Sequence, residues 1–193
     1  MIRSGRRRLI AALAAAPLFP PLAGRADERY SEVRIDGGPY VPTPAGIVEK
    51  MLELAAVRAG DVVYDLGSGD GRLVIEAARR GARGVGIERE ARLVELANAN
   101  AAKAGVAERV RFAQDDLFNV NVADATVLTL YLLPRLLVQL APKLRAELKP
   151  GARVVSHDYP FEAWTPERLL TFEDDEKLYN MGVGSTALYL YRL

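Results

Sequence analysis

The sequence predicts an α/β domain built on a doubly wound parallel sheet. Three apolar runs, at residues 62–66, 83–88 and 110–114, have the length and composition of strands that are buried on both faces. Helical patterns with one apolar face follow the first two runs. Because strands and helices alternate in this way, the strands are expected to be parallel, with helices on both faces of the sheet.

The composition indicates one ordinary globular domain. The chain has 193 residues, of which 50% are hydrophobic and 26% charged. It contains no cysteine, which excludes disulfides and thiolate metal sites, and its single histidine argues against a zinc site formed by protein ligands alone. A formal net charge of +1 gives no sign of a nucleic-acid-binding surface.

The first predicted strand, 62–66, leads into a glycine-rich turn and a helix. Gly67, Gly69 and Gly71 allow the backbone to turn sharply and to approach a ligand closely. The helix that follows is expected to end at Gly81 in a left-handed turn. Such a turn presents free backbone N–H groups to a bound cofactor.

The spacing of the glycines argues against a dinucleotide. A G-x-G-x-x-G motif that begins at Gly67 needs a third glycine at position 72, which is Arg72. Asp65 ends the strand just before the turn, and its carboxylate would repel a pyrophosphate. A cationic cofactor without phosphates, S-adenosyl-L-methionine, fits better, with a nicotinamide oxidoreductase as the alternative.

Acidic residues end the next two predicted strands at the same edge of the sheet. Glu88 is placed to bind a ribose, and Asp115 and Asp116 are placed to accept a hydrogen bond from an adenine amino group. No metal is expected. The predicted cofactor-binding residues are Asp65, Gly67, Ser68, Gly69, Gly71, Glu88, Asp115 and Asp116.

The segment Asp65-Leu66-Gly67-Ser68-Gly69-Asp70-Gly71 resembles the first motif of the class I S-adenosylmethionine-dependent methyltransferases, and Glu88 resembles their second. Segments around Pro39–Pro42, Tyr159–Phe161 and Trp164–Pro166 are similar to a smaller family of protein-lysine methyltransferases, which includes the mitochondrial ATP synthase c-subunit enzyme. The resemblance implies a seven-stranded, Rossmann-like sheet, mostly parallel with a reversed C-terminal strand, and methyl transfer to a protein lysine. A small-molecule methyltransferase and a non-catalytic S-adenosylmethionine-binding module remain the alternatives.

Catalytic residues are harder to identify. Tyr131-Leu132-Leu133-Pro134 stands where many amino-group methyltransferases carry an Asn/Asp-Pro-Pro-aromatic motif, so methylation of an amide or a base nitrogen is disfavoured. Tyr131, His157 and Tyr159 are the candidate catalytic residues near the acceptor, although a lone histidine at a strand end is more often structural. Tyr159 and Trp164 either form an aromatic wall for a lysine or cover the core.

Residues 1–26 resemble a targeting leader. Arg3, Arg6, Arg7 and Arg8 precede an apolar run at 9–19, and small residues end the segment. This predicts a signal peptide and an exported or periplasmic protein, with a mitochondrial presequence or a membrane anchor as alternatives. Membrane contact is expected only through this leader. Export conflicts with the cytosolic origin of S-adenosylmethionine.

A polar linker is expected at 27–39, and the methyltransferase domain at 40–193. A helix should begin with Thr43 as its N-cap. The resemblance implies that this segment lies over the cofactor, which makes Tyr40 and Thr43 candidate lid residues; the alternative is that Tyr40 only packs and Thr43 only caps the helix. The helix after Pro134 should be kinked or divided at Pro142.

The C-terminal part is expected to end in a hairpin. Strands are predicted at 125–131 and 152–157, and a solvated loop at 173–176. The two predicted arms of the hairpin are Lys177–Tyr179 and Ala187–Tyr191, and the turn between them contains Gly182 and Gly184.

Overall fold

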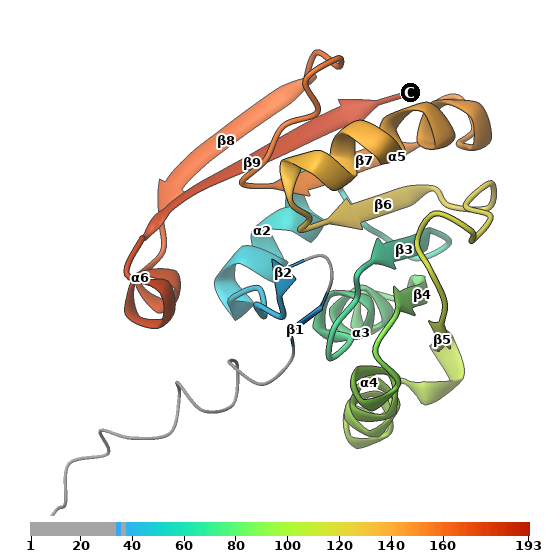
Figure 1. Ribbon diagram of the computed structural model, residues 1–193. Coiled ribbons are helices and arrows are strands. Elements are labelled where there is room, and N and C mark those ends of the chain that lie inside the picture. Colours follow the sequence, from blue (N-terminus) through green and yellow to red (C-terminus); the bar gives the residue numbers. More distant parts are fainter. Residues whose placement is uncertain (1–33, 36–37) are drawn as a thin grey trace, which may run out of the picture.

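The computed structural model describes residues 34–35 and 38–193. The predicted leader, 1–26, and most of the predicted linker, 27–39, lie outside the described residues. A seven-stranded sheet in the order β5-β4-β3-β6-β7-β9-β8 forms the centre of the domain, as Figure 1 shows. This confirms the predicted fold class.

The elements of the described chain have the following bounds. The strands are β1 (Arg34–Ile35), β2 (Gly38–Pro39), β3 (Val62–Leu66), β4 (Arg83–Glu88), β5 (Val110–Gln114), β6 (Val127–Leu130), β7 (Arg153–His157), β8 (Arg168–Glu173) and β9 (Ser185–Arg192). The helices are α2 (Ala45–Leu54), α3 (Arg72–Arg79), α4 (Ala91–Lys103), the 3₁₀ turn η1 (Ala107–Arg109), α5 (Pro134–Glu147) and α6 (Asp175–Met181). None of these helices combines the length and hydropathy that a membrane span requires.

The strand order reverses beside β3. From β3 the chain adds β4 and then β5 on one side, and returns to place β6 and β7 on the other, all of them parallel. Strands β9 and β8 are antiparallel to their neighbours. The topological switch point therefore lies between the adjacent strands β3 and β6. At such a point α/β sheets bind their ligands, beyond the carboxyl ends of the strands.

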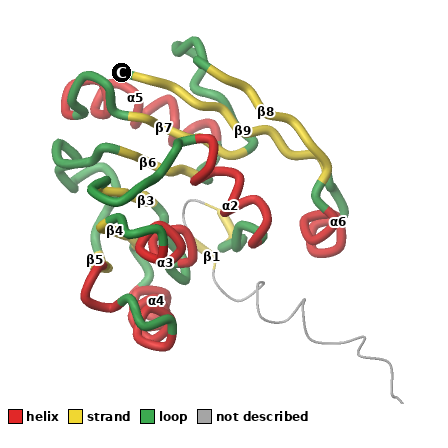
Figure 2. Tube along the Cα trace, turned by 180° about the vertical axis from the view of Figure 1, so that it is seen from behind, coloured by secondary structure: helices red, strands yellow, loops and turns green. Residues whose placement is uncertain are grey.

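Helices cover both faces of the sheet, as Figures 1 and 2 together show. On one face, Leu137, Leu140 and Leu144 of α5 pack in a core cluster that includes Leu66. On the other face, α2 and α3 pack against a cluster that includes Val63. Successive side chains of a strand point to opposite faces, so Asp65 lies on the Val63 face.

The first described helix begins one residue later than predicted. The N-cap of α2 is Pro44, without a side-chain hydrogen bond, so the prediction of Thr43 as the N-cap was wrong. The backbone N–H of Ala45 donates to Oε2 of Glu176 at 3.2 Å instead. A carboxylate more than a hundred residues away thus satisfies an N–H group of the first turn.

Helix α5 continues through Pro142, so of the two predicted outcomes, a kink or a division, the division does not occur. Proline removes the hydrogen bond to the carbonyl four residues earlier, which belongs to Val138. Pro142 and Val138 are both exposed, so water can solvate the freed carbonyl. The buried leucines of α5 lie on the opposite side of the helix.

The C-terminal hairpin exists, but its first arm is β8 rather than Lys177–Tyr179. Residues 173–176, predicted as a loop, end β8 and begin α6. The Asp174 carboxylate caps this helix by accepting a hydrogen bond from the Lys177 N–H at 2.8 Å, and Gly182 ends it with a φ of 73°. Acidic residues in its first turn favour the helix further.

A buried ion pair fixes the amino ends of the central strands. The Asp61 carboxylate is paired with the Arg153 guanidinium and accepts hydrogen bonds from the Thr126 hydroxyl at 2.8 Å and the Arg58 N–H at 2.9 Å. Arg153 also donates to the carbonyls of Ala55 and Ala56. This network connects α2, β3 and β7.

Replacement of Arg153 by methionine should destabilise the fold. It leaves the Asp61 carboxylate buried without its cation, and we expect the free energy of unfolding to fall by about 3 kcal/mol, measured by urea denaturation. Arg192→Met, which breaks the exposed pair with Glu167, is the matched control and should cause little change. Equal losses in both variants would contradict the assignment of Arg153 to a structural network.

Candidate active site

A cavity of about 370 Å³ opens at the carboxyl edge of the sheet, at the switch point between β3 and β6. Its volume falls in the range of small-molecule sites. Of the predicted site residues, Asp65, Gly67, Ser68, Gly69, Glu88, Asp115, Asp116, Tyr131 and Tyr159 line it. The structure therefore brings together most of the residues that the sequence singled out.

The glycine loop approaches β4 closely. The N–H groups of Gly67 and Ser68 donate to the carbonyl of Ile87 at 2.8 and 3.0 Å, and the N–H of Gly69 donates to Oε2 of Glu88 at 2.9 Å. Gly67 and Gly69 have φ values of 82° and 53°, which favour glycine. Hydrogen bonds to β4 therefore hold the shape of the loop.

Gly71 does not line the cavity. It has a φ of 82°, and a Cβ atom there would lie 2.5 Å from the ring of Phe112 and 2.9 Å from Cβ of Ala97. Its small size therefore allows the start of α3 to pack against α4 and β5. The structure places this predicted cofactor-binding residue behind the loop, in a packing role.

Asp65 is buried at the centre of the site. The hydroxyl of Thr129 in β6 donates to its Oδ1 at 2.8 Å. Burial raises the pKa of the Asp65 carboxyl to about 7, the Thr129 hydroxyl opposes this, and the nearby Glu88 and Asp70 carboxylates add to it. Thr129 was missed in the sequence because its partner lies on a neighbouring strand that is distant in the chain.

Glu88 orders the backbone around it. Besides the Gly69 N–H, its carboxylate accepts hydrogen bonds from the N–H groups of Arg89 at 2.7 Å and Glu90 at 3.0 Å. It therefore holds the glycine loop against the start of α4. The same carboxylate lines the cavity, where it is available to a ribose.

Asp115 and Asp116 are exposed on the rim of the cavity. The N–H of Asp115 donates to the Glu88 carbonyl at 3.1 Å, which continues the alignment of β5 with β4. The Asp116 carboxylate accepts a hydrogen bond from the Phe118 N–H at 2.9 Å. Leu117 and Phe118 line the cavity next to it.

The segment before α2 lies over the glycine loop. A Cβ atom on Gly69 would lie 2.4 Å from the ring of Tyr40, and both Tyr40 and Thr43 line the cavity. The Arg72 guanidinium donates to the Thr43 carbonyl at 2.8 Å and pairs with the Asp70 carboxylate at 2.6 Å. Arg72 therefore attaches this segment to the loop, a role that sequence reasoning missed.

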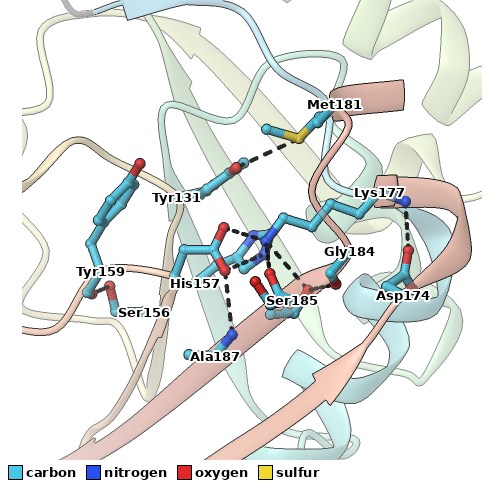
Figure 3. Close-up of polar contacts among 12 residues, drawn as sticks. Tyr131, Ser156, His157, Tyr159, Asp174, Lys177, Met181, Gly184, Ser185 and Ala187 are labelled. Carbon is cyan, nitrogen blue, oxygen red and sulfur yellow. Dashed lines mark hydrogen bonds and ion pairs between the residues drawn. The ribbon is translucent and has the colours of Figure 1, made fainter. Parts of the chain in front are cut away.

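The other end of the cavity is aromatic and apolar. Tyr131, Tyr159 and Met181 line it, and the Tyr131 hydroxyl lies 4.0 Å from the Met181 sulfur (Figure 3). Burial and the neighbouring Asp158 carboxylate raise the pKa of the Tyr131 phenol well above its ordinary value. Tyr131 is therefore neutral at physiological pH.

His157 is placed outside the cavity. Its side chain is fully buried, and its ring packs against that of Tyr131 with 4.0 Å between centroids and a tilt of 32°. Neither ring nitrogen has a hydrogen-bond partner among the described residues, although Nε2 lies 3.5 Å from Oδ1 of Asp158. Burial lowers the pKa of the imidazole to about 4. His157 is therefore a neutral ring that supports Tyr131 and does not face the acceptor.

Trp164 does not line the cavity either. It is buried and stacks on Phe161 at 4.1 Å, with Tyr191 at its edge. Of the two interpretations of Trp164, the structure supports core packing. No group of three metal-ligating side chains occurs in the described part of the chain.

The cavity suits a cationic ligand without phosphates. Five carboxylates, of Asp65, Asp70, Glu88, Asp115 and Asp116, outnumber the two guanidinium groups in the cavity lining, of Arg72 and Arg89, and Arg72 is paired with Asp70. A Cβ atom at Gly67 would lie 3.1 Å from the Leu132 side chain, and one at Gly69 would lie 2.4 Å from the Tyr40 ring, so both glycines allow residues that line the cavity to pack on the loop. The negative charge and the close backbone fit S-adenosyl-L-methionine and disfavour a dinucleotide pyrophosphate.

Comparison with known proteins agrees with this geometry. A family model described as the ANTKMT methyltransferase domain matches residues 65–168. A protein-lysine N-methyltransferase of Saccharolobus islandicus is 44% identical over 155 residues, which cover 79% of this chain and 92% of that protein. The mouse ATP synthase c-subunit lysine N-methyltransferase is 39% identical over 129 residues, which cover 67% of this chain and 52% of that enzyme. The chain thus spans about half the length of the mouse enzyme.

A solved structure supports both the fold and the cofactor. The structure of a Salinibacter ruber protein, described as an RNA methyltransferase in complex with S-adenosyl-L-homocysteine, has a TM-score of 0.71 at 50% identity. The match covers 79% of this chain and 93% of that one. Taken with the family match and the acidic, glycine-lined cavity, these similarities show that the chain belongs to the ANTKMT methyltransferase domain family, whose cofactor is S-adenosyl-L-methionine.

Proposed function

We propose that this protein transfers a methyl group from S-adenosyl-L-methionine to the side-chain amine of a lysine in a protein acceptor. The observation that carries the proposal is the continuity of one cavity, from the carboxylates at Asp65 and Glu88 to the aromatic end at Tyr131 and Tyr159. The Saccharolobus islandicus and mouse relatives are both named lysine N-methyltransferases, which supports lysine as the acceptor.

The acidic end is assigned to the cofactor. Asp65 would attract its positive charge, Glu88 would bind the ribose, and Asp116 would accept a hydrogen bond from the adenine, beside Leu117 and Phe118. Gly67 and Gly69 also line this end, and the lack of a Cβ atom would allow the ligand to approach their backbone closely. When bound, the cofactor supplies a methyl group carried by a sulfonium. After transfer of the methyl group, the rest of the cofactor leaves as a neutral thioether.

The aromatic end is assigned to the acceptor. Because the departing thioether is neutral, no general acid is needed, and correct placement of the amine supplies most of the rate. A free lysine amine has a pKa of about 10.4 and must lose its proton before it can react. Apolar walls at Tyr131, Tyr159 and Met181 disfavour the charged ammonium form and so promote that loss.

The Salinibacter relative is described as an RNA methyltransferase, which makes RNA the second candidate acceptor. The acidic rim at Asp115 and Asp116 argues against a polyanion at this site. A small-molecule acceptor is the remaining alternative. An assay of methyl transfer should therefore compare protein, RNA and small molecules as acceptors.

We also propose that residues 1–26 direct the chain out of the cytosol. The support is the arginine-rich start followed by an apolar run and small residues. Membrane contact through this segment belongs to the same proposal. The protein would then need a supply of S-adenosyl-L-methionine in its destination compartment.

Transfer of labelled methyl groups tests the proposed function. The purified protein, incubated with methyl-labelled S-adenosyl-L-methionine and a cell lysate, should label protein, and mass spectrometry should place the methyl groups on lysine side chains. Nuclease treatment of the lysate should leave the signal intact, while proteolysis should abolish it. Label that is confined to RNA or small molecules would overturn the lysine assignment.

The Asp65 carboxylate should control cofactor affinity in a pH-dependent way. With a pKa near 7, Asp65 loses its proton as the pH rises, and a cationic ligand binds the ionised form more tightly. Affinity should therefore increase about tenfold between about pH 6 and about pH 8. Isothermal calorimetry should find weaker, nearly pH-independent binding in Asp65→Asn.

Glu88→Gln should also weaken cofactor binding without unfolding the protein. Asp124→Asn, at a surface carboxylate remote from the cavity, is the control and should bind like the native protein. Unchanged affinity in both Asp65→Asn and Glu88→Gln would mean that the cofactor site is misplaced.

His157 should be replaceable by an apolar ring. In His157→Phe the ring contact with Tyr131 is kept, and two buried nitrogens without hydrogen bonds are removed together with the 3.5 Å contact between Nε2 and the Asp158 carboxylate. Because the imidazole is neutral, that contact contributes little, and we expect retained kcat, an unchanged pH profile and equal or higher thermal stability. His157→Ala should reduce kcat/KM for the acceptor, because Tyr131 loses its support. Loss of activity in His157→Phe, with normal folding and cofactor binding, would instead make the imidazole catalytic.

A further inference from the structure

Helix α6 buries a charged residue and exposes apolar ones, the opposite of the usual pattern of surface helices. Its single buried residue is Lys177, while Leu178, Tyr179 and Met181 are 51%, 82% and 42% exposed. Val183, in the turn after the helix, is 54% exposed. A helix on a protein surface normally buries its apolar face, so solvent-facing apolar residues of this kind indicate a contact surface.

Polar interactions hold α6 in place. The Lys177 ammonium donates to the Asp158 carboxylate at 2.7 Å and to the carbonyl of Ser185 at 2.6 Å (Figure 3). Asp158 follows the end of β7 with a φ of 62°, unusual for a residue other than glycine, and also accepts the Ala187 N–H. The helix is therefore attached beside the acceptor end of the cavity without using its apolar residues.

The apolar surface of α6 continues into the cavity. Met181 belongs to both, because it lines the cavity with Tyr131 and is also exposed on the helix. Four consecutive carboxylates, at Glu173, Asp174, Asp175 and Glu176, run from the end of β8 into the first turn of α6, and the neighbouring Lys177 is paired with Asp158. A cationic segment with apolar residues would find both complementary charge and apolar contact here.

We propose that α6 is the docking surface for the part of the acceptor protein that carries the target lysine. Apolar residues that flank the lysine would pack on Leu178, Tyr179 and Val183, and the lysine would pass Met181 into the cavity. This inference rests on the proposed lysine methyltransferase function and adds the residues that select the acceptor. The acidic run would attract the basic segment during the approach.

The test uses the full-length protein and three synthetic acceptors. Two are blocked peptides with one central lysine and equal charge, flanked by leucines in one and by serines in the other, and the third is N-acetyl-lysine amide. The double variant Leu178→Ser with Tyr179→Ser is compared with the control Leu96→Ser with Val138→Ser. The control residues are 44% and 53% exposed and lie outside the cavity.

The α6 variant should bind the leucine-flanked peptide about tenfold more weakly by fluorescence anisotropy, with a similar loss in kcat/KM. Its activity on N-acetyl-lysine amide and its cofactor affinity should be unchanged, and the control variant should match the native protein throughout. Native protein that does not prefer leucine over serine flanks, or equal losses in both variants, would overturn the proposal. A native dimer that the α6 variant converts to monomers would also overturn it, because a second copy would then occupy this surface.

The two proposals fail in different ways. Peptide that binds at α6 without receiving a methyl group would count against the lysine methyltransferase function and would leave the docking surface standing. Methyl transfer that the α6 variant leaves intact on all three acceptors would overturn the docking surface alone.

Discussion

Burial of the Asp65 carboxyl at the switch point of the sheet is the constraint on which the site depends. The interior replaces its lost hydration with a hydrogen bond from the Thr129 hydroxyl, while Glu88 and Asp70 add negative charge nearby. At the other end of β3, the similarly buried Asp61 has a cation, Arg153, and a structural role. At the amino edge of the sheet, the buried Asp61 carboxylate is neutralised by a cation of the protein, Arg153. At the carboxyl edge, the positive charge that suits Asp65 would come from the ligand.

The three glycines of the loop have different roles. Gly67 and Gly69 line the cavity, where a Cβ atom would meet Leu132 or Tyr40, whereas Gly71 makes room for Phe112. Glu88 connects the loop to β4 through the Gly69 N–H. The conformation of the loop is therefore fixed by hydrogen bonds within the protein, and such preorganisation reduces the entropy that binding must overcome.

The acceptor half of the site comes from the later part of the chain. Tyr131 follows β6, Tyr159 follows β7, and Met181 ends α6, so three connections converge on one end of the cavity. His157 supports Tyr131 from behind as a neutral ring. The proposed chemistry needs placement and desolvation of an amine, and apolar walls supply both without a dedicated acid or base.

Local sequence determined the parallel core, the glycine loop and the positions of Asp65 and Glu88. Apolar periodicity sets the strands at β3, β4 and β5, and parallel order places their carboxyl ends at one edge. The tertiary structure alone decided that Gly71 packs, that His157 turns inward, and that Lys177 lies in a helix rather than a strand. Each of these outcomes depends on a partner distant in sequence: Phe112 for Gly71, Tyr131 for His157 and Asp158 for Lys177. Local periodicity carries no information about such partners, because the folded sheet brings them together.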